Sequence, residues 1–571
     1  MWCKICSHNT NKTACELCGS LTDPEIPIEI FWCSVCAVPV IKSAKDINKK
    51  NCAHCNNPIT YLCADLRPVF PEERLLFEIM HEKPLAHIND SVWANDNRYY
   101  INGKSNAVTS IFYRKFSPLL IREQLEKYSN QNSYTHFNEV IKRFIEVNKK
   151  HLVGISDEAR AFIAKIAFSY TAKEIVISFS GGKDSTVVAD LVVRGLSDPG
   201  LVHIFGDTTL EFPATMEYAD RFRQNNPKSI FKVARNSEQN FYDVCNDIGP
   251  PARMLRWCCS MFKTGPITRT LNRLYGDKSI LTFYGVRKYE SVSRSRYSRI
   301  EGDTETIKIQ KQRVASPVFL WKDIDIWLYI LGEGIDFNSA YRLGYDRVGC
   351  WCCPNNNLRA QFLSGIYMPE QSKQWKDFLV GFAKRIGKLD AEEYVDSGAW
   401  KARQGGNGVE AASDVKIRFA NCTTEENAKL YQLNKPIEDN FIELFVPFGR
   451  IASELGRKLI KETMIVDILT NVPILSIQPL SQGEYEHSVK IKTMNVSKHG
   501  DLHRMVGYQI KKYNACRKCL KCESLCRNRA ISMISGEYRI NEQRCNRCKM
   551  CVTAKYIEGG CLMEKYLKTK G

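Results

Sequence analysis

A short apolar run that leads directly into a glycine loop and then into a helix-compatible stretch constrains the fold more than any other feature. The run covers residues 175–179, the loop is Ser180-Gly181-Gly182-Lys183-Asp184-Ser185, and the stretch covers residues 186–194. Glycines let the backbone turn sharply beside an anion, and a helix N-terminus directs free N–H groups at it. The sequence therefore predicts a phosphate-binding loop. Its spacing departs from the Walker A pattern, which disfavours a phosphoryl-transfer NTPase of that class.

The segments around this loop alternate between helix and strand. We expect a helix over residues 156–170, a strand over 174–179, and a second strand over 201–205 that is followed by Asp207. Strands separated by helices form parallel sheets, and the loops at their carboxyl ends form the site. The predicted core is therefore of the α/β class, with a doubly wound, Rossmann-like parallel sheet.

The 24 cysteines fall mostly in Cys-x-x-Cys pairs, a spacing that suits metal binding better than disulfides in a reducing cell. Two successive sets open the chain, in a region with too few apolar residues to build a core. Thiolates on two turns can close a tetrahedral Zn²⁺ site and stabilise such a fold. We predict one or two zinc ribbons that brace the next domain, with rubredoxin-like iron as the alternative. The ligands are Cys3, Cys6, Cys15 and Cys18, then Cys33, Cys36, Cys52 and Cys55.

A third cysteine-rich segment closes the chain with the spacing of a bacterial ferredoxin, in which three close thiolates hold one cluster and the fourth serves its neighbour. The second run departs from that pattern, because its last cysteine follows ten residues later and the usual proline is missing after both runs. We predict two four-iron clusters, with zinc knuckles as the alternative. One set is Cys516, Cys519, Cys522 and Cys561, and the other is Cys545, Cys548, Cys551 and Cys526.

The glycine loop resembles the PP-loop of the adenine-nucleotide alpha hydrolase superfamily, and four further segments resemble its PAPS reductase branch. They are residues 205–213 with Asp207, residues 256–259 with Lys263, residues 285–287 with Arg294, and residues 317–350. Thr209 stands where this branch usually has glycine. The resemblance spans roughly residues 174–354 and implies an adenine nucleotide as ligand, namely APS, PAPS or ATP, with Mg²⁺ as an open addition.

The resemblance also assigns roles to residues. A nucleotide of this kind carries several negative charges, and Arg and Lys neutralise such groups. Lys183, Arg287 and Arg294 are the predicted catalytic cations. The predicted nucleotide-binding residues are Ser180, Gly181, Gly182, Lys183, Asp184, Ser185, Asp207, Lys263 and Arg287.

A central cysteine quartet lies beside these motifs. Adjacent cysteines plus a distant Cys-x-x-Cys resemble the four-iron cluster of APS reductases and of the ATP-pyrophosphatase subunit of DNA phosphorothioation. We assign Cys258, Cys259, Cys350 and Cys353 to this cluster. Use of Cys352 and a structural zinc remain the alternatives.

Motifs and composition together divide the 571 residues into several units. No apolar run approaches the ~20 residues of a membrane helix and no secretory signal is visible, so we expect a cytoplasmic protein with no membrane partner. The units are zinc ribbons at 1–63, a mixed α/β connecting module at 64–155, the PP-loop domain at 156–387, a linker and small α/β segment at 388–500, and a ferredoxin-like α+β domain at 501–571.

The preferred function is reduction of a sulfonucleotide, because clusters beside a nucleotide site imply an electron path and a redox partner protein. The Glu-Cys-Gly-Leu-His signature that carries the family's nucleophilic thiol is absent, so either the clusters supply electrons directly or a free thiol such as Cys245 or Cys422 acts. The alternative is an ATP-pyrophosphatase that adenylates DNA or tRNA for sulfur insertion. The net charge of +18 and the ribbons favour that nucleic-acid partner. A non-enzymatic electron carrier is disfavoured because the nucleotide motifs are intact.

Overall fold

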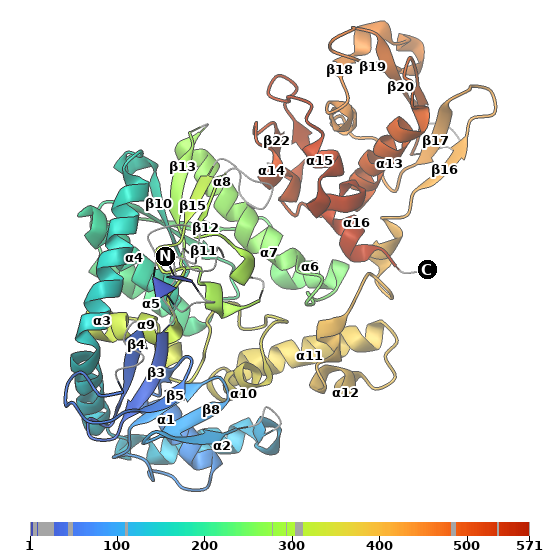
Figure 1. Ribbon diagram of the computed structural model, residues 1–571. Coiled ribbons are helices and arrows are strands. Elements are labelled where there is room, and N and C mark those ends of the chain that lie inside the picture. The colour runs from blue at the N-terminus through green and yellow to red at the C-terminus, as the bar shows by residue number, and fades with distance from the viewer. Residues whose placement is uncertain are drawn as a thin grey trace.

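The computed structural model describes residues 2–3, 8–9, 28–43, 50–108, 112–276, 278–292, 294–302, 312–480, 487–533 and 536–569. Figure 1 shows the arrangement of these segments, with the residues up to about 332 forming one lobe and the carboxyl-terminal segments forming a second. None of the helices in the described ranges is both long and apolar enough to cross a membrane.

A six-stranded sheet forms the centre of the first lobe, in the order β12-β11-β10-β13-β15-β14. The first five strands run parallel, and β14 pairs antiparallel at the edge. The order reverses between β10 and β13, and ligands of doubly wound sheets bind at such a switch point. The predicted parallel core is therefore confirmed. The strands are β10 (Ile175–Phe179), β11 (Val202–Asp207), β12 (Ile230–Arg235), β13 (Ile280–Phe283), β14 (Ile300–Glu301) and β15 (Gln312–Ala315).

Helices connect these strands and carry the polar residues of the site. They are α4 (Lys183–Leu196), α5 (Pro213–Asn225), α6 (Phe241–Ile248), α7 (Trp257–Cys259), α8 (Gly265–Tyr275) and α9 (Asp323–Gly332). A five-residue π-helix, Ser260–Thr264, joins α7 to α8. Single π-turns are rare and occur often at functional sites.

One long helix corrects the predicted domain boundary. The sequence predicts separate helices over 137–147 and 156–170, but α3 runs unbroken over Thr135–Ala167. Its buried face includes Val140, Phe144, Leu152 and Ile163, at the spacing that holds one face of a helix against a core. The proposed boundary at residue 155 therefore falls inside a helix and does not separate two units.

The amino-terminal part forms three small antiparallel sheets, the first of which pairs only β1 (Trp2–Cys3) with β2 (His8–Asn9). The ribbon sheet contains β3 (Ile28–Cys33), β4 (Val38–Ser43) and β5 (Thr60–Cys63). Asn148 of α3 ties this sheet to the core, because it accepts from Ile41 N at 2.8 Å and donates to Pro39 O at 2.9 Å. The third sheet contains β6 (Arg67–Pro68), β7 (Val92–Asn95), β8 (Arg98–Ile101) and β9 (Lys104–Ala107), beside α1 (Pro71–Met80) and α2 (Pro118–Tyr128).

Three helices lead from the first lobe toward the second, namely α10 (Leu358–Tyr367), α11 (Pro369–Arg385) and α12 (Ala391–Asp396). A six-stranded antiparallel sheet follows, in the order β16-β17-β21-β20-β19-β18. Between Arg418 and Thr493 the described residues form strands and 3₁₀ turns, so the predicted small α/β segment is instead a β-sheet unit. Its strands are β16 (Arg418–Asn421), β17 (Ala428–Gln432), β18 (Arg450–Ala452), β19 (Thr463–Val466), β20 (Pro473–Leu480) and β21 (Ser488–Thr493).

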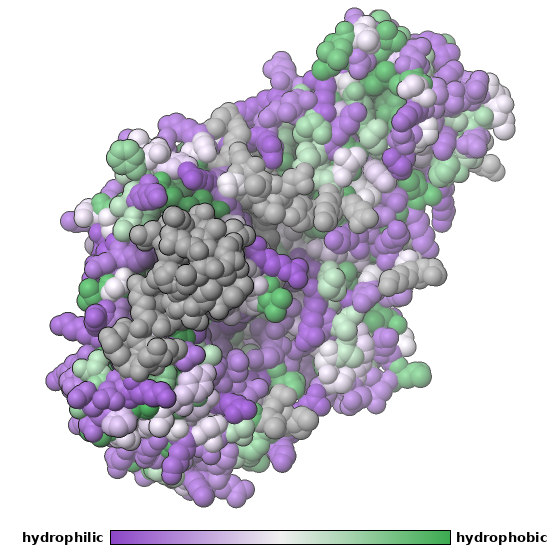
Figure 2. Space-filling model, viewed as in Figure 1, coloured by the Kyte–Doolittle hydropathy of each residue, from purple (hydrophilic) through white to green (hydrophobic). Residues whose placement is uncertain are grey.

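Exposed apolar side chains gather on the outer end of this sheet unit. Leu455, Leu459, Ile468 and Leu469 are at least half exposed. Figure 2 shows hydrophobic residues over β18–β20, while the rest of this face is largely hydrophilic.

The tail packs between the antiparallel sheet and the first lobe (Figure 1). It begins with α13 (His499–Ala515), and its cysteine runs form short elements around this helix. These elements are α14 (Lys521–Leu525), β22 (Ile531–Ser532), β23 (Arg539–Ile540), α15 (Met550–Thr553) and α16 (Leu562–Leu567).

Candidate functional site

The glycine loop follows β10 and opens α4, as its sequence predicts. Gly181 has φ +69°, and an added Cβ would lie 2.8 Å from the Thr215 side chain, so glycine is required there. Gly182 occupies the N-cap of α4 without a capping side chain. Ser185 Oγ donates to Gly182 O at 2.8 Å and accepts from Ser180 N at 3.1 Å. These bonds hold the loop around a helix N-terminus that suits an anion.

Four charged side chains form a network beside this loop. Lys183 Nζ lies 3.2 Å from Asp323 Oδ1, and Arg287 Nη2 lies 2.8 Å from the same oxygen. Arg287 Nε pairs with Asp184 Oδ1 at 2.5 Å. The side chains of Lys183 and Arg287 are each only 5% exposed, so each of these charges needs a partner. The predicted residues Lys183, Asp184 and Arg287 are thus brought together.

Asp323 and Asp65 belong to this site, although the sequence interpretation did not single them out. Asp323 begins α9, within the segment 317–350 that carries the family resemblance. Asp65 comes from the connecting module at 64–155, in which the sequence shows no chemical motif. Its carboxylate accepts from the backbone N of Asp323 at 3.1 Å and of Ile324 at 3.2 Å. Burial and the charge of Asp323 raise the pKa of Asp65 to about 6.

A buried ion-pair network links the same module to the loop. Arg67 pairs with Glu73 at 2.6 Å, and Arg359 also contacts that carboxylate. Arg67 Nε lies 3.0 Å from an Asp346 carboxylate oxygen, and Lys183 Nζ donates to Asp346 O at 3.3 Å. The module therefore helps to hold Lys183 in place, because Arg67 fixes Asp346 and the backbone O of Asp346 accepts from Lys183 Nζ. Sequence reasoning missed it because the contacts join residues nearly 300 positions apart.

The remaining predicted nucleotide residues lie around this network. Asp207 ends β11 and accepts from Thr209 N at 2.8 Å. Thr209 has φ +64°, a conformation that glycine adopts more readily. Arg294 pairs with Glu290, and burial together with the nearby charge of Arg347 lowers the pKa of Arg294. Lys263 is exposed on the π-helix, and its charge acts on Glu211 and Cys350. The charges of Asp184 and Arg287 also act on the pKa of Arg294, so Arg294 lies close to the Lys183–Arg287 network, whereas Lys263 lies near Glu211 and Cys350.

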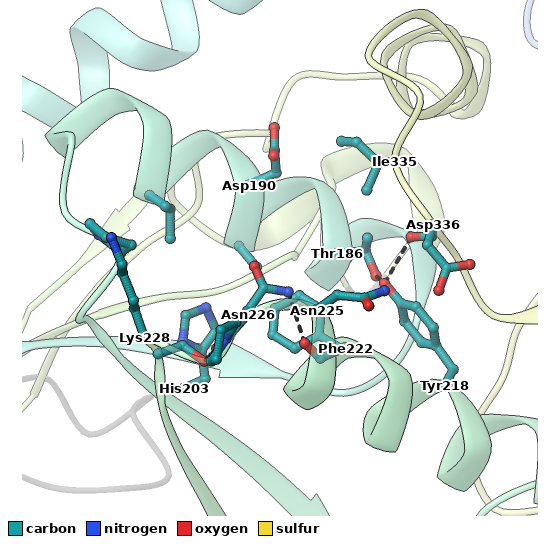
Figure 3. A pocket seen from close by; sticks show the side chains of 15 residues that line it. Thr186, Asp190, His203, Tyr218, Phe222, Asn225, Asn226, Lys228, Ile335 and Asp336 are labelled. Carbon is teal, nitrogen blue, oxygen red and sulfur yellow. Dashed lines mark hydrogen bonds between the residues drawn. The ribbon is translucent and has the colours of Figure 1, made fainter.

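A separate cavity of about 360 Å³ lies between α4 and α5 (Figure 3). Thr186, His203 and Tyr218 line it, and burial lowers the pKa of His203 to about 4. His203 lies near the amino end of β11, whereas Asp207 marks the carboxyl end. Ligands of doubly wound sheets bind at carboxyl ends, so this cavity is not the nucleotide site.

One ribbon has the geometry of a single-ion site. The sulfur atoms of Cys33, Cys36, Cys52 and Cys55 lie within 4.8 Å of one another, with Cys33 and Cys55 at 3.5 Å and Cys36 and Cys52 at 3.9 Å. Tetrahedral Zn²⁺ with Zn–S bonds of about 2.3 Å would place its sulfurs about 3.8 Å apart. These residues fit such an ion. The predicted set Cys3, Cys6, Cys15 and Cys18 lies outside the described side chains.

The central cysteines gather at the carboxyl end of β11. Cys350 bridges Glu211 in a short antiparallel contact, and its sulfur lies 3.4 Å from Thr208 Oγ1. The neighbouring Cys259 thiol, then burial and the charges of Cys350 and Cys352, raise the pKa of Cys258. Burial and the charge of Cys259 raise the pKa of Cys353. The four assigned cysteines and Cys352 therefore form one group.

The sulfur spacing distinguishes this group from the ribbon. Among the described residues, no three central cysteine sulfurs fall within the 4.8 Å limit that the ribbon satisfies. A multi-iron cluster holds its thiolates farther apart than a single ion does, because iron and sulfide atoms separate them. The donor set is compatible with a four-iron cluster.

The tail cysteines form two adjoining groups around α13. Burial and the charges of Cys516, Cys522 and Cys561 raise the pKa of Cys519. Burial and the charges of Cys526 and Cys548 raise the pKa of Cys545. Cys551 interacts with members of both groups. Lys512 is buried between them and donates to Cys551 O. Cys519 and Cys545 have neighbours from their own predicted ligand sets, whereas Cys551 has neighbours from both sets, and the eight cysteines could hold metal or iron–sulfur clusters.

The tail is docked directly against the central cysteine segment. An added Cβ on Gly265 of α8 would lie 2.6 Å from the Leu520 side chain, so α8 and α14 approach closely. Arg269 of α8 pairs with Glu523 of α14 at 3.1 Å. Burial, and then the charges of Cys519, Cys259 and Cys258, raise the pKa of Tyr566. Tyr566 therefore lies near both cysteine groups. The two groups therefore lie next to each other in one packed structure.

The parallel sheet and the glycine loop at the start of α4 define an α/β domain with a candidate anion-binding site. Residues 174–356 match the family model of the phosphoadenosine phosphosulfate reductase domain. An uncharacterized protein of Methanocaldococcus jannaschii is 30% identical over 276 residues, which cover 48% of this chain and 55% of that protein. A second uncharacterized protein of that organism is 30% identical over 272 residues, which cover 47% of this chain and 61% of that protein. This chain therefore matches only about half to three fifths of the length of these two relatives.

Named relatives and a solved structure cover the nucleotide domain. An adenosine 5'-phosphosulfate reductase of Staphylococcus epidermidis is 25% identical over 209 residues, which cover 35% of this chain and 79% of that protein. A crystal structure of phosphoadenylyl-sulfate reductase from Candida auris has a TM-score of 0.28 and 17% identity, and the match covers 37% of this chain and 95% of that one.

Proposed function

We propose that this protein reduces an adenosine sulfonucleotide, APS or PAPS, to sulfite and the corresponding adenosine phosphate. The observation that carries the proposal is the position of Cys350. Its segment contacts Thr208 and Glu211 at the carboxyl end of β11, beside the loop with Lys183 and Arg287. A nucleotide held at the loop by its phosphate would therefore have the cysteine group as a neighbour.

The residues of this chain would bind and orient the substrate. Lys183 and the free N–H groups at the start of α4 would bind the phosphate. Arg287 would loosen its ion pairs with Asp184 and Asp323 and bind the same phosphate. Asp323 and Asp184 hold these two cations before substrate arrives. Asp207 could accept a ribose hydroxyl. The proposal leaves open whether Mg²⁺ binds with the nucleotide, because the Asp184 and Asp323 carboxylates are already paired with cations.

The reaction needs two electrons. The bond between the sulfate sulfur and the bridging phosphate oxygen breaks, sulfur is reduced to sulfite, and the nucleotide keeps that oxygen. Four-iron clusters on the central quartet and the tail octet would supply electrons one at a time. A redox partner protein would have to reduce the tail clusters again after each turnover.

The positions of the free thiols favour this direct supply over a nucleophilic cysteine. Cys245 is completely buried in α6. Cys422 follows β16 in the second lobe, where its sulfur lies 3.3 Å from Thr424 Oγ1 (Figure 1). Neither thiol contacts the Lys183–Arg287 network among the described residues.

The second candidate is an ATP-pyrophosphatase that adenylates DNA or tRNA for sulfur insertion. The same cations could hold ATP, and the metal-binding geometry of the ribbon together with the net charge of +18 is compatible with a nucleic-acid partner.

Product analysis separates the two functions. Anaerobically purified protein with reduced viologen should release sulfite from APS or PAPS, and should not convert ATP to AMP and pyrophosphate when RNA or DNA is added. Lys183→Met should weaken nucleotide binding about ten- to a hundredfold, because it removes a buried charged donor. Lys232→Met on the exposed side of β12 is the matched control and should bind normally with the same iron content. Nucleic-acid-dependent pyrophosphate release without sulfite would support the second candidate instead.

A further inference from the structure

The two predicted cysteine sets of the tail differ in their exposure to solvent. Cys548 is exposed, and Cys526 and Cys545 are half-buried, whereas three of the four cysteines in the other set are buried. We call the exposed set the distal set and the buried set the proximal set. The distal set is Cys526, Cys545, Cys548 and Cys551, and the proximal set is Cys516, Cys519, Cys522 and Cys561.

The proximal set lies next to the central cysteines. Leu520, directly after Cys519, packs against Gly265 at the start of α8. The same chain segment contains Cys258 and Cys259 in α7. An electron carrier in solution would therefore reach the distal set first, and its electrons would pass through the proximal set to the central cysteines.

Basic residues flank the distal set. Within three residues of its cysteines, the chain has five basic side chains and two acidic ones. Both carboxylates are paired, Glu542 with Arg547 at 3.2 Å and Glu523 with Arg269 of α8 at 3.1 Å. The surface around the distal set thus has a net positive charge. The five basic residues are Arg527, Arg529, Arg544, Arg547 and Lys549.

The turn between β19 and β20 presents apolar side chains to solvent. We call residues 467–472 the hairpin tip. Ile468 is 53% exposed, Leu469 is 91% exposed and Val472 is 38% exposed. Exposed aliphatic side chains that gather in this way are typical of a surface that binds another protein.

Two contacts place the hairpin tip beside the distal set. Ile451 N of β18, the strand paired with β19, donates to Glu542 Oε1 at 3.0 Å, and the same oxygen lies 3.2 Å from Arg547 Nη2. Hydrogen bonds from within the tip, and then the charge of Lys549, lower the pKa of Asp467. The apolar tip and the cations around Cys548 therefore form one continuous surface.

This combination fits a protein better than a nucleic acid. Electron-transfer proteins meet over small interfaces, and complementary charge steers the two partners together. A single nucleic-acid strand would instead be held by cations together with aromatic rings on which its bases stack. The hairpin tip offers aliphatic side chains at that place, so the surface favours a protein partner with negative charge.

We propose that a small acidic one-electron carrier protein docks on the surface formed by Cys548, Arg544, Lys549 and the hairpin tip. Each carrier molecule is oxidised by one electron, and the distal set receives that electron, with no transfer of atoms. The docking site rests on the proposed function, which requires a partner that reduces the tail. It adds where that partner binds and which charge it carries.

The test uses the full-length protein, purified anaerobically with oxidised clusters, and an acidic flavodoxin in its hydroquinone form as the probe. The anionic flavin hydroquinone loses one electron and becomes the neutral blue semiquinone, which stopped-flow absorbance follows. Flavodoxin should reduce the wild type, and its rate constant should fall about tenfold between about 0.01 M and about 0.5 M salt, because salt screens the attraction. Reduced methyl viologen is run in parallel, as a small reductant that needs no docking surface.

Two variants connect the reduction to this surface. Lys549→Glu should lower the flavodoxin rate constant at low salt about three- to tenfold, because it opposes an acidic partner. Leu469→Ala should raise the Kd for oxidised flavodoxin about three- to tenfold. The matched controls are Lys458→Glu and Leu459→Ala, whose exposed side chains lie before β19, whereas the hairpin tip follows it. Both controls should behave like the wild type, and iron content and reduction by methyl viologen report on cluster loading in every variant.

Two results would overturn the proposal. The first is that flavodoxin reduces Lys549→Glu as fast as the wild type and binds Leu469→Ala equally well. The second is that flavodoxin leaves the wild-type clusters oxidised while methyl viologen reduces them. Binding of a single-stranded oligonucleotide that Lys549→Glu weakens would then assign the surface to nucleic acid.

Sulfite release from APS or PAPS with methyl viologen separates this proposal from the proposed function. Reduction by flavodoxin without any sulfite would refute the sulfonucleotide reaction and leave the docking site standing. Sulfite release with methyl viologen but no reduction by flavodoxin would refute the docking site alone.

Discussion

At the scale of residues, the site depends on carboxylates that hold cations in place. Asp184 and Asp323 neutralise Lys183 and Arg287 in the described structure. The cations could be predicted from the sequence because motifs of the family carry them. Asp65 could not, since a lone aspartate in a segment without a motif gives no signal until the fold places it at the start of α9.

Glu73 gives the clearest pH-dependent prediction at this scale. Burial alone would raise its pKa, but the charges of Arg67 and Arg359 lower it to about 2. A depressed carboxyl pKa stabilises the fold above the unfolded value of about 4.5, and the contribution is lost as pH falls toward 2. Glu73→Gln should therefore lower the free energy of unfolding by about 3–5 kcal/mol at pH 7.

The measurement is denaturant unfolding of wild type and Glu73→Gln between pH 7 and pH 3. The difference between the two proteins should shrink below about pH 4.5. Glu126→Gln, from an exposed pair on α2, is the control and should change the free energy by less than about 1 kcal/mol. A Glu73→Gln difference that stays constant down to pH 3 would mean that the Glu73 charge is not what stabilises the network.

At the scale of elements, local pattern predicted the core well and the second lobe poorly. The strand, glycine loop and helix at 175–196 follow the expected order, because apolar runs and glycines specify them locally. The break expected in α3 is wrong, since its long buried face holds the helix together through tertiary packing. The antiparallel sheet of 418–493 was missed although four of its five strand pairs join consecutive strands, and only β17 and β21 pair across a long separation in sequence.

The ribbon sheet should depend on its metal. Cys36→Ser should lose about one zinc atom per chain, because a tetrahedral site needs all four thiolates. Loss of the ion should also loosen β3 and β4 from α3, which metal analysis and hydrogen exchange at Ile41 would detect. Cys63→Ser on β5 is the control, since Cys63 Sγ donates to Asp65 O and lies outside the four-sulfur group. Unchanged metal content in Cys36→Ser would refute the assignment.

At the scale of the whole molecule, two cysteine-rich parts far apart in the sequence form one packed unit. A continuous hydrophobic core runs from Trp257 and Cys352 to Cys519 and Leu562. The sequence indicated the ligand sets but not their contact, because nothing in local spacing shows which faces of two domains meet.

The Arg269–Glu523 pair should hold this contact. Arg269→Glu places like charges at the α8–α14 interface and should speed hydrogen exchange in α14 roughly tenfold. The double variant Arg269→Glu, Glu523→Arg should restore much of the protection, although Glu238, which also contacts Arg269, limits the recovery. Equal exchange in the wild type and the single variant would show that the pair does not secure the tail.

The central claim is that electrons held by this chain reduce a sulfonucleotide bound at the glycine loop. A single-turnover experiment tests it most directly: the protein is reduced under anaerobic conditions, excess reductant is removed, and APS or PAPS is added. The account predicts that cluster absorbance returns to the oxidised form as sulfite appears, with one sulfite for every two electrons, and that Lys183→Met is much slower at limiting substrate. Clusters that stay reduced while the nucleotide remains intact would contradict it.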